Sequence, residues 1–274
     1  AGVVGHSHHG VTLGTEPTTQ NSGLASLIAI KLSLGEDGDQ HTTSTKRMTI
    51  SVLGSGDATV VTPDAALPEP LRDTAISCRL LAVPDAVFPG SIQERVICEQ
   101  AYFDAGMASA ADGAEALYIN TVGDYGVTKL QTALDIPVSG AGAGALRQAL
   151  QRADRFSILT LWPPGMRFIY DMMMSESGLS DFCNEILHLS SDNILASESG
   201  PAEAMKTFQA CGVTTIEKVV RSITALSTRH PGDAIVLGCT CMYPLARVLK
   251  TRGLEVVEPM FAGYRRLSDS MLSA

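Results

Sequence analysis

The stretch ALYINTVGDYG, residues 116–126, is an apolar run followed by a polar turn that contains glycine. A second stretch, DAIVLGCTCMY at residues 233–243, has the same design. Long apolar runs that end in a glycine turn are typical of buried strands in α/β proteins. The similarity of the two stretches predicts two similar α/β lobes, each with a loop at the carboxyl ends of its strands.

Strand-like and helix-like segments alternate on both sides of these stretches, from Met48 to the end of the chain. Strands are expected at residues 49–54, 77–83, 116–122, 136–140, 155–162, 185–191, 233–239 and 254–259. Helices are expected at residues 67–75, 91–113, 126–134, 143–153, 165–177, 200–212, 214–232, 243–253 and in the tail. Strands separated by helices form βαβ crossovers, which make parallel sheets. The pattern therefore predicts an α/β fold with a four-stranded parallel sheet in each lobe.

Three regions follow from this pattern. Residues 48–141 together with 254–274 form the first lobe, and residues 142–253 form the second. Residues 1–47 are rich in Gly, Thr, Ser and His and are interpreted as an N-terminal extension whose role the sequence does not indicate. Two alternatives stay open there: Met48 as the natural start, or a first strand at Gly2–Gly5.

Composition excludes several classes of function. The 274 residues carry a formal net charge of −9, which argues against nucleic acid and anionic membranes as partners. No apolar run approaches the roughly 20 residues of a membrane span, and no secretory signal is visible. The six cysteines contain no CxxC pair, so we expect reduced thiols, a cytoplasmic location and no zinc site. The cluster His6, His8 and His9 has no acidic residue at ligand spacing, and a solvated segment is the favoured reading.

Two turns carry the candidate chemistry. Cys239 follows an apolar strand directly, at the edge where open α/β sheets bind ligands. A helix that begins after the turn can lower the pKa of a thiol, but cysteine is also among the most buried residue types. Thr121 holds the corresponding position in the first stretch, where, taken alone, a turn residue or helix cap is the favoured reading. If the lobes face each other, one turn lies on each side of a cleft.

From Met48 to its end the chain resembles the aspartate/glutamate/hydantoin racemase superfamily, and most closely its hydantoin racemase branch. Four segments carry the resemblance: ALYINTVGDYG (116–126), FPGSIQER (88–95), IPVSGAGAGALRQALQRADRFSILT (136–160) and DAIVLGCTCMYPLA (233–246). The resemblance implies an enzyme without cofactor or metal. It also implies two pseudo-symmetric Rossmann-like lobes, an active-site cleft between them, and a homo-oligomer.

Racemases of this superfamily place two cysteines on opposite faces of an acidic carbon next to a carbonyl. One thiolate removes the proton, and the other thiol returns one from the far face. By this resemblance Cys239 is the second cysteine and Thr121 stands in the place of the first. The expected substrate contacts are Ser55, Gly56, Val122, Gly123, Asp124, Thr160 and Thr240.

The sequence departs from the family pattern in three places. Thr121 replaces a cysteine, and a hydroxyl is a far weaker acid than a thiol. Tyr125 replaces a proline of the first turn. The stretch GSGDAT (54–59) replaces Asn-Pro-Asn-Thr-Ser, so a changed substrate is expected. Asp57 in that stretch is read as a helix cap rather than a new polar contact.

The resulting hypothesis is a cofactor-independent racemase or isomerase that acts on a small carboxylate, amino acid or hydantoin. One alternative is a single-cysteine decarboxylase or lyase similar to arylmalonate decarboxylase, in which Cys239 only protonates. The other is a non-catalytic protein that binds a small anion. We expect packing roles for Cys241 and for the methionines of YDMMMS (170–175), and no catalytic role for His188 or His230.

Overall fold

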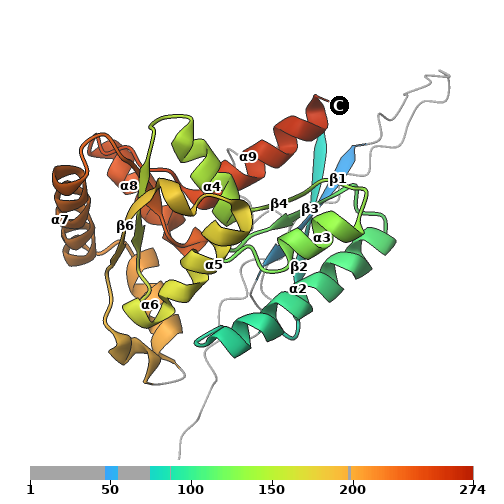
Figure 1. Ribbon diagram of the computed structural model, residues 1–274, viewed down its shortest axis with the longest axis horizontal. Coiled ribbons are helices and arrows are strands. Elements are labelled where there is room, and N and C mark those ends of the chain that lie inside the picture. Colours follow the sequence, from blue (N-terminus) through green and yellow to red (C-terminus); the bar gives the residue numbers. More distant parts are fainter. Residues whose placement is uncertain (1–46, 55–74, 87, 197–198, 274) are drawn as a thin grey trace, which may run out of the picture. The chain divides into compact units, whose positions relative to one another are not determined.

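The computed structural model describes residues 47–54, 75–86, 88–196 and 199–273 (Figure 1). The chain divides into two compact units, Ala1–Ser44 and Thr45–Ala274, and the structure given below belongs to the second. Several predictions lie outside the described residues: the N-terminal histidine cluster, the contacts at Ser55 and Gly56, the cap at Asp57 and the helix at 67–75.

Two parallel sheets form the framework of the second unit (Figure 1). The first has the order β2-β1-β3-β4, built from β1 (Met48–Gly54), β2 (Ile76–Ala82), β3 (Ala116–Ile119) and β4 (Val138–Gly140). The second has the order β6-β5-β7, built from β5 (Phe156–Thr160), β6 (Cys183–His188) and β7 (Ala234–Leu237). The α/β class and the parallel sheets predicted from the sequence are confirmed. We call the first sheet with its helices the first lobe, and the second sheet with its helices the second lobe.

The strand expected at residues 254–259 is reduced to a single bridge, and this bridge lies at the edge of the second sheet. Val257 pairs with Val236, donating to Ile235 O at 2.8 Å and accepting from Leu237 N at 3.0 Å. Glu258 then caps the next helix and Pro259 opens it. Because proline has no amide hydrogen and its φ suits a helix start, pairing stops there. Val257 thus takes the place in the second sheet that β4 takes in the first.

The helices lie between the strands as the sequence pattern predicts. They are α2 (Ile92–Ala111), α3 (Val127–Ala133), α4 (Ala141–Leu150), α5 (Arg167–Ser177), α6 (Gly200–Gln209), α7 (Val213–Arg229), α8 (Tyr243–Thr251) and α9 (Pro259–Leu272). Local chemistry sets their ends. Ser91 Oγ accepts from Glu94 N at 3.2 Å while the Glu94 carboxylate accepts from Gly90 N, which is a capping arrangement at the start of α2.

Strand β3 shows how the first sheet is covered on both faces. Ala116 and Tyr118 pack in one buried cluster with residues of α9, whereas Leu117 and Ile119 pack in another with residues of α2 and α3. This alternation is the period of two that a strand imposes on its side chains. All four side chains are 0% exposed, so β3 is apolar throughout because both faces are buried. In the second lobe, Met173 and Met174 of α5 are buried in its core, which confirms their packing role.

Helices α4 and α9 connect the two lobes. Helix α4 leads from β4 toward β5, and α9 follows Val257 and packs on the first sheet. Their crossing is lined by small residues. A Cβ placed on Gly144 would lie 2.5 Å from Gly263 Cα, and one on Gly263 would lie 2.8 Å from Ala141 Cα. Only glycine fits at Gly144 and Gly263 without separating the helices, and this accounts for part of the glycine-rich stretch at 140–144.

Candidate active site

Thr121 and Cys239 occupy the same place in the two sheets. Each is the second residue beyond a strand, after Ile119 at the end of β3 and Leu237 at the end of β7. Both strands pair in parallel with the first strand of their lobe, and the last residue of each is in register with a leucine of that strand. The carboxyl ends of parallel strands are where α/β proteins bind ligands. The structure therefore gives the two residues equivalent positions at the expected edge.

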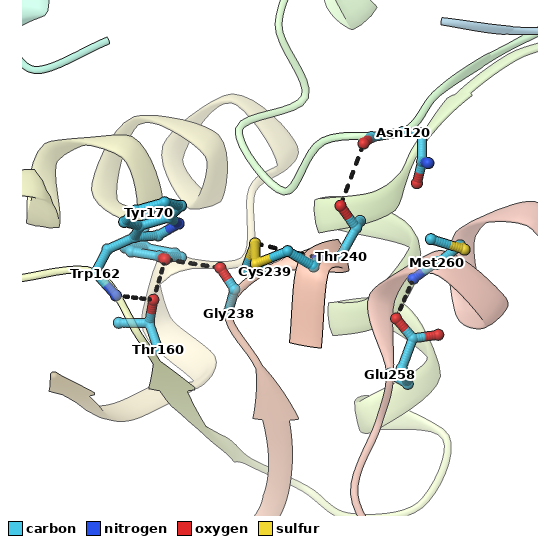
Figure 2. Close-up of a disulfide and its surroundings, with 10 residues drawn as sticks. Asn120, Thr160, Trp162, Tyr170, Gly238, Cys239, Thr240, Glu258 and Met260 are labelled. Carbon is cyan, nitrogen blue, oxygen red and sulfur yellow. Dashed lines mark hydrogen bonds between the residues drawn. A yellow bond between two sulfur atoms is a disulfide. The ribbon is translucent and has the colours of Figure 1, made fainter. Parts of the chain in front are cut away.

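The two turns touch each other. The Thr240 hydroxyl donates a hydrogen bond of 3.4 Å to the backbone carbonyl of Asn120, as Figure 2 shows. Asn120 directly precedes Thr121 and Thr240 directly follows Cys239. A bond between these neighbours brings the candidate acid/base residues of both lobes to one site.

A chain of hydrogen bonds through two buried hydroxyl groups holds the backbone next to Cys239 (Figure 2). Trp162 N donates to Thr160 Oγ1 at 3.1 Å, Thr160 lies 2.5 Å from the Tyr170 hydroxyl, and that hydroxyl donates to Gly238 O at 2.7 Å. Thr160 and Tyr170 are both fully buried. Burial raises the pKa of the Tyr170 phenol, which keeps its proton available for the Gly238 carbonyl. Thr160 is thus hydrogen-bonded within the protein and, through Tyr170, helps to hold Gly238, which precedes Cys239. Its expected contact with the substrate remains a prediction.

A buried carboxyl group holds the Thr121 turn. Asp124 Oδ1 accepts from Gly142 N at 2.8 Å and Oδ2 accepts from Ala143 N at 2.7 Å, at the start of α4. A Cβ on Gly142 would lie 2.2 Å from Val122 O, so the turn approaches the helix closely. Burial raises the pKa of Asp124 to about 7, although the two amide donors act in the opposite direction. Both carboxyl oxygens accept from α4, so Asp124 positions the turn, and its expected contact with the substrate remains a prediction.

Tyr125, which replaces the family's proline, packs under the same turn. It is 6% exposed, and a Cβ on the buried Gly123 would lie 2.4 Å from its ring. The guanidinium carbon of Arg95 lies 5.8 Å from the ring centroid. Arg95 is fully buried and pairs with Glu99 of its own helix and with Glu176 of α5, at 2.9 Å for the latter. Tyr125 therefore places a packed aromatic ring under the Thr121 turn. Its cation–π contact joins this turn to Arg95, whose pair with Glu176 links the two lobes.

Two polar atoms of the first turn are buried without a partner. Asn120 Oδ1 and Thr121 Oγ1 are shielded from solvent and have no hydrogen-bond partner among the described residues. Buried polar atoms are nearly always paired in folded proteins, and the exceptions gather at functional sites. Asn120 was not among the predicted site residues. The feature of the sequence that could have pointed to Asn120 is its position, as a polar residue directly after a fully apolar strand.

Cys239 is joined to Cys241 in a disulfide (Figure 2). The Cys239 residue is extended, and the short helical turn Thr240–Met242 that follows brings the two Cα atoms to 5.2 Å. Cys241 also packs against the core as predicted. The expectation that all six cysteines are reduced is wrong for this pair because the local backbone places their sulfur atoms side by side. It holds for Cys78, Cys98, Cys183 and Cys211, which are free.

The two histidines discussed above lie at different ends of the second sheet. His188 ends β6 at the carboxyl edge and donates from Nδ1 to Trp162 O at 2.9 Å, and burial lowers its pKa. His230 precedes β7 and pairs with Glu185. Within the described ranges, no group of three or more His, Cys, Asp or Glu residues could hold a metal ion, and no helix is long and apolar enough to cross a membrane.

Comparison with known proteins agrees with this geometry. Residues 86–267 match the family model described as Asp/Glu/hydantoin racemase. A hydantoin racemase of Rhizobium meliloti is 26% identical over 165 residues, which are 60% of this chain and 63% of the relative. This chain thus matches less than two thirds of the length of that curated relative.

Two solved structures are similar in fold. An allantoin racemase from Klebsiella pneumoniae is 18% identical with a TM-score of 0.63, over 82% of this chain and 88% of that one. An allantoin racemase from Pseudomonas fluorescens is 21% identical with a TM-score of 0.63, over 82% of this chain and 92% of that one. The family match spans both turns and most of the two sheets, and the chain belongs to the Asp/Glu/hydantoin racemase family.

Proposed function

We propose that this protein, with Cys239 reduced, is a cofactor-independent racemase. It removes and returns a proton at an acidic carbon next to a carbonyl of a small ureide, amino acid or other carboxylate. The observation that carries the proposal is the meeting of the two turns through Thr240 and Asn120, which brings the equivalent residues Thr121 and Cys239 to one site. Membership of a racemase family supports the same reaction class.

Cys239 is the proposed acid/base. In the reduced protein its sulfur can take the proton as a thiolate and return it as a thiol. The Cys241 amide donates to Cys239 Sγ at 3.2 Å, and a donor aimed at the sulfur favours the thiolate. The bond from Tyr170 to Gly238 holds the adjoining backbone, so the sulfur is presented in a fixed position.

Thr121 is the proposed partner on the opposite face of the substrate. Its hydroxyl is a much weaker acid than a thiol, so proton return from this side is slow. We therefore expect asymmetric chemistry, in which Cys239 removes a proton and often returns one to the same face. Inversion then requires the slower delivery from the Thr121 side.

The substrate is held by polar groups of both turns. Asn120 Oδ1 can accept a hydrogen bond from a substrate N–H, and Thr121 Oγ1 can donate to or accept from a polar group of the ligand. The backbone of Val122 and Gly123 and the hydroxyl of Thr240 are the further contacts that we propose. Contacts from Ser55 and Gly56 remain predictions. Hydantoin and allantoin, named in the relatives, are the first substrates to test.

The test is proton exchange in heavy water, followed by NMR. Single enantiomers of allantoin, a 5-substituted hydantoin, aspartate and glutamate are incubated with reduced wild type, with Cys239→Ala and with the control Cys183→Ala. The proposal expects deuterium at the acidic carbon with the wild type and the control, and a loss of about 100-fold or more with Cys239→Ala. Equal exchange by wild type and Cys239→Ala would contradict it.

A second candidate is a single-cysteine decarboxylase, and the lack of a second cysteine opposite Cys239 is the observation that supports it. In that reaction carbon dioxide leaves a disubstituted malonate, and Cys239 protonates the remaining enediolate from one face only. Deuterium incorporation that occurs only together with release of carbon dioxide would select this function. The cytoplasmic location and homo-oligomeric state expected from the sequence remain part of the proposal for either reaction.

A further inference from the structure

The sulfur that the proposed reaction needs is bonded to a second sulfur. Cys239 and Cys241 form a disulfide across Thr240, and their Cα separation of 5.2 Å lies in the ordinary range for such bonds. A sulfur in a disulfide carries no proton and is not a thiolate, so it can neither remove nor return a proton. We propose that Cys241 is a redox partner whose disulfide with Cys239 reversibly switches off the site, and that reduction switches it on. The proposal rests on the function assigned above to Cys239.

The geometry makes the switch a local event. Cys239 is extended, Thr240 starts a single helical turn, and the Cys241 amide donates to Cys239 Sγ at 3.2 Å. The bond between Thr240 and Asn120 and the bond between Tyr170 and Gly238 are both present together with the disulfide. The contacts that hold the two turns are therefore compatible with the disulfide. The active-site framework is ready in the oxidised form and lacks only the thiol.

The two cysteines of the disulfide differ in their exposure to solvent. Cys239 is 9% exposed, whereas Cys241 is half-buried and lies nearer to solvent. An incoming thiolate therefore reaches the Cys241 sulfur more readily, and the leaving group is then the Cys239 thiolate. Attack in this direction produces directly the species that the proposed reaction uses.

The other cysteines are poor competitors for oxidation. Burial raises the pKa of all four free thiols, to about 12 for Cys98 and about 11 for Cys183. Cys98 is also only 2% exposed. Because the thiolate is the form that oxidants attack, few of these side chains react at neutral pH. Oxidation is thus directed to the pair at positions 239 and 241, where two sulfurs are already adjacent.

The redox steps balance as two-electron reactions. In oxidation by a peroxide, the Cys239 thiolate attacks one oxygen, the O–O bond breaks, and a sulfenic acid and hydroxide form. The Cys241 thiol then displaces water from that sulfenic acid and closes the disulfide. In reduction, one thiolate of a dithiol attacks Cys241 Sγ and releases the Cys239 thiolate. The second thiol of the dithiol resolves the mixed disulfide, leaving two protein thiols and an oxidised dithiol.

The test combines a thiol count with the heavy-water exchange assay. The full chain is oxidised with diamide, a two-electron thiol oxidant, or reduced with dithiothreitol, then freed of reagent and labelled with iodoacetamide under denaturing conditions. Mass spectrometry of the oxidised wild type is expected to show four labelled cysteines, since four are free, and the reduced protein to show all six. Exchange is expected to fall about 100-fold or more on oxidation and to return with dithiothreitol.

Two variants separate the switch from general thiol damage. Cys241→Ser keeps the backbone amide and removes the partner sulfur, so its exchange rate is expected to be the same before and after diamide. Cys211→Ser changes a free cysteine elsewhere and should behave as wild type. Six labels on diamide-treated wild type, or full exchange by a protein with four labels, would overturn the proposal. Lack of exchange by the reduced wild type on every substrate would instead contradict the proposed function, and the label count would still decide whether the disulfide forms.

Discussion

The Thr240 hydroxyl donates a hydrogen bond of 3.4 Å to the carbonyl of Asn120, and this bond joins the turn after β7 to the turn after β3. Each partner is the direct neighbour of a candidate acid/base residue, Cys239 in one turn and Thr121 in the other. The two residues differ in acidity, and this difference determines how the site is expected to behave. It leads first to a prediction about the direction of proton return.

Thr121→Cys is expected to make the proposed reaction more symmetric. In the wild type, deuterium should enter one enantiomer with retention faster than that enantiomer racemises, because Cys239 returns protons more readily than Thr121 does. A thiol at position 121 supplies a stronger acid on the far face of the substrate. The ratio of the racemisation rate to the deuterium-exchange rate should therefore rise about tenfold or more. Chiral chromatography and NMR of the same reaction in heavy water measure both rates. Thr128→Cys, on the exposed surface of α3, is the matched control.

Tyr170→Phe tests the support under Cys239. The substitution leaves Thr160 and the Gly238 carbonyl with one hydrogen bond fewer in a fully buried setting. An unpaired buried polar group costs about 1–3 kcal/mol, so the free energy of unfolding should fall by about that amount. Urea denaturation followed by circular dichroism measures it. The control is Tyr243→Phe, which changes a half-buried tyrosine whose ring stacks on Phe261. If the free energy of unfolding falls equally in both variants, the hydrogen bonds of the Tyr170 hydroxyl add no particular stability.

Arg95→Met tests the link between the lobes. Arg95 is fully buried and pairs with Glu99 and Glu176. Its removal leaves Glu176 without its cation and Glu99 with only the partly exposed Lys129 at 3.6 Å, and it removes the cation–π contact of Tyr125. Breaking a buried ion pair in this way costs about 3–5 kcal/mol. The free energy of unfolding should fall accordingly, whereas Arg167→Met, which disrupts an exposed pair with Asp171, should cost about 1 kcal/mol or less. Equal losses in the two variants would show that burial of the Arg95 pair contributes nothing.

The two buried capping carboxyls predict an unusual dependence of stability on pH. Burial raises the pKa of Asp124, and likewise of Glu258, to about 7, above their ordinary values of 3.8 and 4.5. The folded protein then binds more protons than the unfolded chain between about pH 4 and pH 7. The stability that these groups contribute is therefore present below pH 4 and is lost as the pH rises through 7.

Asp124→Asn isolates one of these groups. Between pH 5 and pH 7 the difference in unfolding free energy between wild type and variant should shift against the wild type by at most about 1.4 kcal/mol per pH unit. Urea denaturation at several pH values measures this difference. Asp112→Asn, at an exposed residue, provides the control. A difference that rises with pH would mean that the Asp124 carboxyl is ionised at the start of α4 throughout this range.

Much of the fold could be predicted because the chain marks its elements locally. Apolar runs such as 116–119 are buried on both faces, and glycine and proline mark the ends of the helices between them. The strand expected at 254–259 did not form because Glu258, directly after Val257, caps α9 and Pro259 begins it. The lobe boundaries at 141/142 and 253/254 remain predictions.

The candidate site could be predicted less completely than the fold. Cys239 and Thr121 could be found because both follow conspicuous strands. The hydrogen bonds of Tyr170 could not be found, since its position facing Gly238 depends on how α5 packs across the second sheet. The disulfide was missed because it depends on the backbone angles of Cys239 and the turn after it, which cysteine spacing alone does not specify.

The central claim is that Cys239 and Thr121 face one substrate carbon from opposite sides. A crystal structure of the reduced protein with allantoin or a hydantoin bound tests it most directly, through the distances from Cys239 Sγ and Thr121 Oγ1 to the acidic carbon. We expect both atoms to lie about 3–4 Å from that carbon, on opposite faces and about 7–8 Å from each other. A ligand whose acidic carbon contacts Cys239 while Thr121 points away from it, or lies on the same face, would contradict the paired site.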